Sequence, residues 1–74
     1  MKENDNTIQV KIKDFRKQQG LSQEDLAEAL GISRQSIIAL EQGKSMPSLP
    51  LAVNLCQFFN SAFEEIFEFE RQMD

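Results

Sequence analysis

The stretch "LSQEDLAEALGISRQSIIALEQGK", residues 21–44, contains two helix start signals of the same kind. At the first, Ser22 can accept a hydrogen bond from a backbone N–H of the first turn, and Asp25 follows three residues later as an acidic capping-box partner. Gly31 then stands where a helix end favours a left-handed backbone. These signals predict a helix that begins after Ser22 and ends before Gly31.

The same arrangement then repeats, with Ser33 as the cap of a second helix and Gly43 as its stop. At both starts, apolar residues occupy the two positions that pack across a helix start; the pairs are Leu21 with Leu26 and Ile32 with Ile37. Only a very short turn separates the two helices, so they must cross at a steep angle. The sequence therefore predicts a helix-turn-helix.

The second of these helices has two distinct sides at about 100° per residue. Its inner side carries Ser36, Ile37, Leu40 and Glu41, and its outer side forms one continuous arc of Arg34, Gln35, Ile38, Ala39 and Gln42. Proteins that read the major groove use this mixture, because arginine pairs with guanine, glutamine with adenine, and small apolar groups with the thymine methyl. We therefore predict base contacts by Arg34, Gln35, Ile38 and Ala39. The alternative interpretation is an ordinary solvated helix face.

Helix starts also present N–H groups and polar side chains that suit phosphate, and a cation after the second helix suits a backbone charge. The predicted contacts to the DNA backbone are Ser22, Gln23, Ser33, Gln42 and Lys44. For Lys44, a solvated surface lysine is an equal alternative. Arg16 and Glu41 lie beside apolar core positions instead, and we predict a partly buried ion pair between them.

Two segments near the ends of the chain alternate apolar with polar residues, which is typical of strands. In "TIQVKI" the pattern predicts a strand near residues 7–10 and then a helix near 11–19; in "IFEFER" it falls on Phe67 and Phe69. Between them, Ser48 and Asn60 bound a further helix, and Ser61 with Glu64 predicts a capping box for a last short one. We expect the two alternating segments to pair as an antiparallel ribbon. Alternatively, the phenylalanines continue the last helix or cover the core.

An isolated ribbon is marginally stable in water, so its apolar face needs a partner, which a second copy would supply. The predicted dimer interface comprises Phe58, Phe63, Phe67 and Phe69. Among 74 residues there is one cysteine, Cys56, and no histidine, which excludes an internal disulfide and leaves too few zinc ligands. We expect no metal, no cofactor and no membrane contact, a cytoplasmic location, and no enzymatic activity.

The net charge of −4 is unevenly distributed along the chain. Residues 8–48 have a balance of +1, while residues 1–7 contribute −1 and residues 49–74 contribute −4. The acid is thus concentrated away from the predicted helix-turn-helix. Because phosphate is repelled by a chain that is acidic overall, we expect affinity for DNA to depend on helix starts, a few cations and two copies acting together.

The segment "LSQEDLAEALGISRQSIIALEQGKSMPSLPLA" resembles the Cro/phage-repressor type of helix-turn-helix regulators, the xenobiotic-response-element family, and the resemblance covers about residues 11–67. It is most similar to compact bacterial members that consist of this domain only. The resemblance implies a mainly α, five-helix domain that dimerises on palindromic operators. It further implies that Gln23 contacts phosphate and that Arg16 and Glu41 form a structural ion pair. We expect a flexible tail over 1–6, the DNA-binding and dimerisation domain over 7–71, and a tail over 72–74.

The leading functional hypothesis is a homodimeric regulator of transcription, a repressor that binds double-stranded DNA. The alternative is a protein-interaction module, or an antitoxin-like protein that binds a separate protein partner, built on the same fold.

Overall fold

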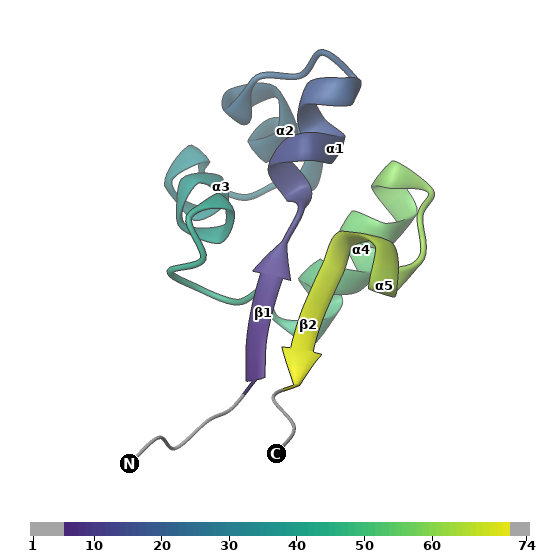
Figure 1. Ribbon diagram of the computed structural model, residues 1–74. Coiled ribbons are helices and arrows are strands. Elements are labelled where there is room, and N and C mark those ends of the chain that lie inside the picture. Colours follow the sequence, from purple (N-terminus) through teal and green to yellow (C-terminus); the bar gives the residue numbers. More distant parts are fainter. Residues whose placement is uncertain (1–5, 72–74) are drawn as a thin grey trace.

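The computed structural model describes residues 6–71, so the predicted tails lie almost wholly outside it. In chain order its elements are β1 (Asn6–Val10), α1 (Ile12–Gln18), α2 (Gln23–Leu30), α3 (Arg34–Glu41), α4 (Leu49–Phe59), α5 (Phe63–Ile66) and β2 (Phe67–Arg71). Figure 1 shows α1, α2 and α3 grouped on one side, α4 and α5 on the other, and the two strands side by side. The predicted fold, five helices with a terminal antiparallel ribbon, is confirmed.

The ribbon joins the two ends of the described chain, with Ile8 opposite Phe69 and Val10 opposite Phe67. Paired residues of an antiparallel ladder project on the same face, so Val10 and Phe67 lie together on its apolar face. Val10 is half-buried and Phe67 is buried. On the other face, Glu68 pairs with Lys11 at 3.0 Å.

Three of the predicted helix starts are formed by the residues expected. Ser22 and Asp25 form a complete capping box, in which each side chain accepts a hydrogen bond from the other residue's backbone N–H. Ser33 and Ser48 each accept the backbone N–H of the residue three positions on. Serine fits these positions because its short side chain reaches N–H groups that have no partner inside the helix.

The capping box predicted for the last helix is wrong. The Ser61 hydroxyl donates backwards to the Phe59 carbonyl at 3.0 Å, at the end of α4. The helix therefore begins one residue later, and Glu65 accepts the Ala62 backbone N–H at 2.8 Å. The short connection after Asn60, whose left-handed φ of 52° ends α4, directs Ser61 toward the preceding helix.

The core draws on every helix and on β2. Its buried apolar residues are Ile12, Leu26, Ala27, Ile37, Leu40, Ala52, Leu55, Phe59, Ile66 and Phe67. Phe67, which the sequence analysis assigned to the dimer interface, belongs to this core. With 5% of its surface exposed, Phe67 has almost nothing left to offer a second copy. Within residues 6–71, no helix combines the length and the apolar character needed to cross a membrane.

Candidate nucleic-acid interface

The connection between α2 and α3 consists of three residues, 31–33. Gly31 has a φ of 72°, a left-handed conformation that strains other residues, and the Ile32 N–H donates to the Ala27 carbonyl at 3.0 Å. This is the arrangement that closes a helix through a left-handed glycine. The tight closure turns the chain sharply, so α3 crosses α2 and packs against it. Leu26 on α2 and Ile37 on α3 are both buried in the same core.

Helix α3 presents the predicted base-contacting side chains on the side away from the core. Ile37 and Leu40 are buried, with 0% and 2% of their surface exposed, and they anchor the helix. Arg34 and Gln35, in the first turn, are exposed. The other two predicted base contacts, Ile38 and Ala39, are half-buried. Figure 1 shows α3 at the edge of the molecule, where a long ligand can approach it.

The two capping serines that were predicted to contact phosphate already serve their own helices. The Ser22 hydroxyl oxygen accepts the Asp25 N–H at 2.9 Å. The Ser33 oxygen accepts the Ser36 N–H at 3.1 Å and lies 3.0 Å from the Ser36 hydroxyl. Both side chains are exposed, so capping and a phosphate contact are compatible at these positions.

Asp25 adds a negative charge at the start of α2. The backbone N–H of Ser22, and then its hydroxyl, hold the pKa of the Asp25 carboxyl below its ordinary value. The carboxylate is therefore ionised at neutral pH and occupies the positive end of the helix dipole. It competes there with any phosphate, which makes the start of α3, where Ser33 caps without an acidic partner, the less repulsive of the two helix starts.

After α3 the backbone is tied back onto the helix. The Gln42 N–H donates to the Ile38 carbonyl at 3.0 Å, and the Lys44 N–H donates to the Ala39 carbonyl at 2.9 Å. Both side chains are exposed. The ammonium of Lys44 is thus carried at the C-terminal end of α3, where it favours the negative end of the helix dipole and is also available to a phosphate.

Arg16 and Glu41 form the ion pair that joins α1 to the end of α3. Arg16 Nε lies 2.7 Å from Glu41 Oε2, and its Nη2 donates to Oε1 at 3.2 Å. Arg16 Nη1 also donates to the Leu21 carbonyl at 2.8 Å, just before α2. The side chains are 9% and 4% exposed. One guanidinium therefore holds all three helices of this half of the molecule in a fixed arrangement.

Gln23, which was predicted to contact the DNA backbone, also has a partner within the domain. Its Nε2 donates to Glu41 Oε1 at 3.1 Å, so the amide belongs to the ion-pair network as well as to the start of α2. The second hydrogen on that nitrogen remains for another acceptor. Nothing in the sequence signals this contact, because the two residues are 18 positions apart and follow no helical spacing.

Burial opposes the ionisation of Glu41, but its partners outweigh it. Hydrogen bonds from Arg16 and Gln23, with the positive charges of Arg16 and Lys13, lower the pKa of the Glu41 carboxyl below its ordinary value. The hydrogen bond to Glu41 in turn raises the pKa of Arg16 against the effect of its own burial. The pair is therefore fully charged at neutral pH.

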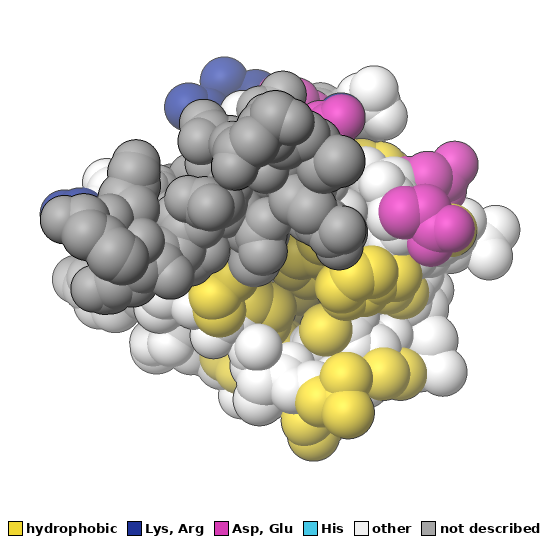
Figure 2. Space-filling view, turned by 60° about the horizontal axis from the view of Figure 1, so that its bottom comes forward, with side chains coloured by type: hydrophobic (Ala, Val, Ile, Leu, Met, Phe, Trp, Pro, Cys, Tyr) yellow, Lys and Arg dark blue, Asp and Glu magenta, His cyan; other side chains and the backbone are white. Residues whose placement is uncertain are grey.

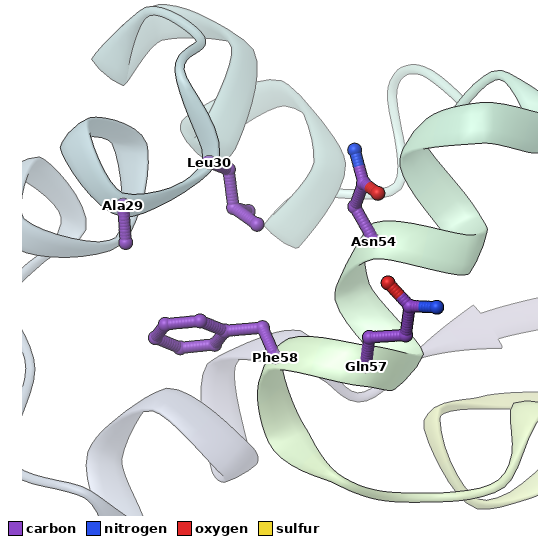
Figure 3. A pocket seen from close by; sticks show the side chains of 5 residues that line it. All are labelled: Ala29, Leu30, Asn54, Gln57 and Phe58. Atoms are coloured by element: carbon purple, nitrogen blue, oxygen red, sulfur yellow. The ribbon is translucent and has the colours of Figure 1, made fainter.

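A shallow cleft lies between the end of α2 and α4. It has a volume of about 310 Å³ and is lined by Ala29, Leu30, Asn54, Gln57 and Phe58. Figure 3 shows Leu30 and Phe58 across from each other, with the two amide side chains on α4. No charged side chain lines it. Within the described part of the chain, no three potential metal ligands come together.

Comparison with known proteins agrees with this geometry. A helix-turn-helix family model matches residues 12–66. An uncharacterized HTH-type transcriptional regulator of Methanocaldococcus jannaschii is 52% identical over 60 residues, which cover 81% of this chain and 91% of that protein. The uncharacterized HTH-type transcriptional regulator YgzD of Bacillus subtilis is 40% identical over 62 residues, or 84% and 94% of the two chains.

The solved structures support the fold alone. A protein from Bacteroides fragilis superposes with a TM-score of 0.75 at 24% identity, covering 84% of this chain and all of its own. The transcriptional regulator VanUg superposes with a TM-score of 0.74 at 19% identity, covering 97% and 96% of the two chains. Because the sequence relatives come from both archaea and a bacterium, the likeness does not restrict the chain to bacteria, as the sequence-based interpretation did.

Proposed function

The chain belongs to the helix-turn-helix family of Cro/C1 type, whose domain binds DNA in transcriptional regulators, and from that premise we propose that it acts as a homodimeric repressor at a palindromic operator. The observation that carries the proposal is the outer side of α3. Arg34 and Gln35 are exposed in the first turn of a helix whose opposite side is anchored by fully buried residues. A recognition helix enters the major groove with this part of its surface.

The four side chains on that surface divide the reading of a site. Arg34 can form two hydrogen bonds with a guanine, and Gln35 can form two with an adenine. Ile38 and Ala39 offer apolar surface to thymine methyl groups. Ile38 and Ala39 are half-buried, so less of their surface is available to a base. Arg34 and Gln35 are exposed and longer, so they extend furthest toward the DNA and carry most of the sequence preference.

Charge explains why two copies are needed. Arg34 and Lys44 are the cations on or just after α3, and the whole chain has a net charge of −4. Glu64 and Glu65 lie on α5, which Figure 1 shows on the opposite side of the molecule from α3, and Glu68 lies on β2, beyond β1 from α3. These three carboxylates are thus held away from the recognition helix. One copy still has few phosphate contacts, and a dimer doubles them on two half-sites about one helical turn apart.

A second function is favoured by one observation. Phe63 is 52% exposed and Phe58 36% exposed, and both lie outside the proposed DNA-binding surface. Exposed apolar groups of this kind mark contact sites for proteins. A protein-interaction module, or an antitoxin-like regulator that binds both DNA and a protein partner, would use them.

The test is the salt dependence of binding to a fluorescent random-sequence duplex, followed by anisotropy. We expect binding at about 50 mM salt that falls steeply toward about 200 mM, because each phosphate contact releases counterions. Replacing Arg34 with alanine should weaken it further, whereas Gln57→Ala, on α4, should not. A folded protein with no affinity for DNA even at the lower salt concentration would refute the proposal and favour the interaction module.

A further inference from the structure

Nineteen consecutive residues, 45–63, include no charged side chain, although 27% of the chain is charged. They comprise the end of the α3–α4 connection, α4 and the start of α5. Every large hydrophobic side chain that is exposed among residues 9–68 falls within them: Met46, Leu49, Val53, Phe58 and Phe63. Figure 2 shows hydrophobic side chains gathered on one face, with the charged side chains of that view at its margin. Protein contact surfaces are depleted of charge in this way.

The exposed residues of α4 lie on two separate sides of the helix. Leu49 is 77% exposed and Val53 is 46% exposed, and their spacing of four residues places them side by side. Phe58, nine residues after Leu49, projects from about the opposite side at about 100° per residue and lines the cleft with Leu30 (Figure 3). Met46, 48% exposed, precedes α4 in the connection from α3. We call Met46, Leu49 and Val53 the α4 face.

We propose that the α4 face is the surface through which two copies of this chain pack against each other. This inference rests on the proposed homodimer and names its contact surface. In a two-fold contact the same patch is used on both sides, so Leu49 and Val53 of one copy would cover the same residues of the other. A leucine with 77% of its surface in water gains most from such cover.

Charge identifies the occupant as a second copy. Two chains with a net charge of −4 repel each other, and the repulsion is weakest where neither surface carries a charge. A basic partner would instead be matched by carboxylates, and segment 45–63 has none. The acidic residues that follow it, Glu64 and Glu65, are exposed on α5. The α4 face is therefore suited to a partner of the same charge as the chain itself.

The position of the α4 face also fits two-site binding. The chain runs from the end of α3 through the connection 42–48 to the start of α4 (Figure 1), so a contact made there is close in sequence to the recognition helix. Packing through Leu49 and Val53 leaves the exposed Arg34 and Gln35 uncovered, because those residues belong to the outer side of α3. The dimer would then present two α3 helices related by a two-fold axis.

The experiment compares the variant Leu49→Glu/Val53→Glu with Phe58→Glu, which places a charge on the opposite side of α4, at a residue that the sequence analysis assigned to the dimer interface; the comparison therefore distinguishes the two surfaces. Glutamate is a better helix former than valine, and at the first position of α4 it favours the helix dipole, so neither change should unfold the subunit. Analytical ultracentrifugation should show a dimer for the unmodified chain and for Phe58→Glu. For the double variant we expect the dimer dissociation constant to rise at least about a hundredfold, because like charges would face each other.

A rescue separates lost contact from lost fold. Mixing the double-glutamate variant with Leu49→Lys/Val53→Lys should restore a dimer, since opposite charges then meet across the axis. If the unmodified chain is a dimer and the double-glutamate variant dimerises equally well, the assignment of the α4 face is overturned while the homodimer stands, and the ribbon or Phe63 becomes the contact. A chain that stays monomeric at every concentration, with and without DNA, overturns both.

Discussion

Breaking the Arg16–Glu41 pair from one side should destabilise the domain severely. The two side chains are 9% and 4% exposed, and their contacts of 2.7 and 3.2 Å form a two-point guanidinium–carboxylate pair. Removing one partner leaves the other charge buried without compensation, which costs about 3–5 kcal/mol. A domain of this size has a free energy of unfolding of about 4–11 kcal/mol. Arg16→Met or Glu41→Leu alone should therefore remove between about a quarter and all of the stability.

The double variant Arg16→Met/Glu41→Leu should be more stable than the worse of the single variants, because no unpaired charge remains. It should still be less stable than the unmodified chain, since the Leu21 carbonyl and the Gln23 amide lose their partners. Urea unfolding followed by circular dichroism measures all four proteins; a loss of about 3 kcal/mol lowers the midpoint by about 3 M at a slope of about 1 kcal/mol/M.

The exposed pair of Lys11 and Glu68 is the matched control for this cycle. Its contact is 3.0 Å, but its side chains are 40% and 53% exposed. Its coupling energy should be about 0.2–1 kcal/mol, as for other solvent-exposed pairs. If the single losses at Arg16 and Glu41 simply add in the double variant, or if their coupling is no larger than that of the control pair, the structural role assigned to the buried pair is wrong.

Three further predictions concern pH, capping and phosphate. Because the folded-state pKa of Glu41 is lowered, the ionised carboxylate makes its full contribution to stability above the unfolded pKa of about 4.3, and this contribution disappears as the pH falls through the folded value. The urea midpoints of the unmodified chain and of Glu41→Gln should therefore converge over that pH range. A constant difference between the midpoints would contradict this. Ser22→Ala should lose about 1 kcal/mol of unfolding free energy. NMR titration should show the pKa of Asp25 rising part of the way toward its ordinary value, because the Ser22 hydroxyl is lost while the backbone N–H of residue 22 still donates to the carboxylate; an unchanged pKa would contradict this. Lys44→Ala should weaken binding to all duplexes alike and reduce the salt slope by about one, whereas a changed sequence preference would count against a backbone contact.

Much of the fold was predictable because the signals are local. The capping serines and Gly31 act within a few residues of themselves, and the structure forms the helix starts and the turn that they predict. The terminal ribbon required pairing between distant segments, yet the alternation around Val10 and Phe67 was sufficient, because a period of two places both on one face. The capping-box signal was misleading at Ser61. Its hydroxyl could either cap the following helix or donate to a carbonyl of the preceding one, and it donates to the Phe59 carbonyl.

The sequence does not show which of several possible partners a side chain contacts in the folded chain. Gln23 has the polar side chain and the helix-start position of a phosphate-binding residue, but only the folded arrangement brings its amide to Glu41. Phe67 has the alternation of a residue on a ribbon face, but whether that face meets the core or a second copy depends on where α5 turns the chain. Leu49 is a leucine at a helix start, and nothing in the sequence indicates that 77% of its surface is exposed.

The central claim is that the outer side of α3 reads a two-fold symmetric DNA site. Selection of bound sequences from a random duplex pool, repeated with Gln35→Ala and with the control Gln57→Ala, tests it most directly. We expect two inverted half-sites about 10 base pairs apart, with Gln35→Ala losing the preference at one symmetry-related pair of positions and Gln57→Ala retaining the full motif. A pool that yields no enriched motif, or a motif that Gln35→Ala leaves unchanged, would contradict the claim.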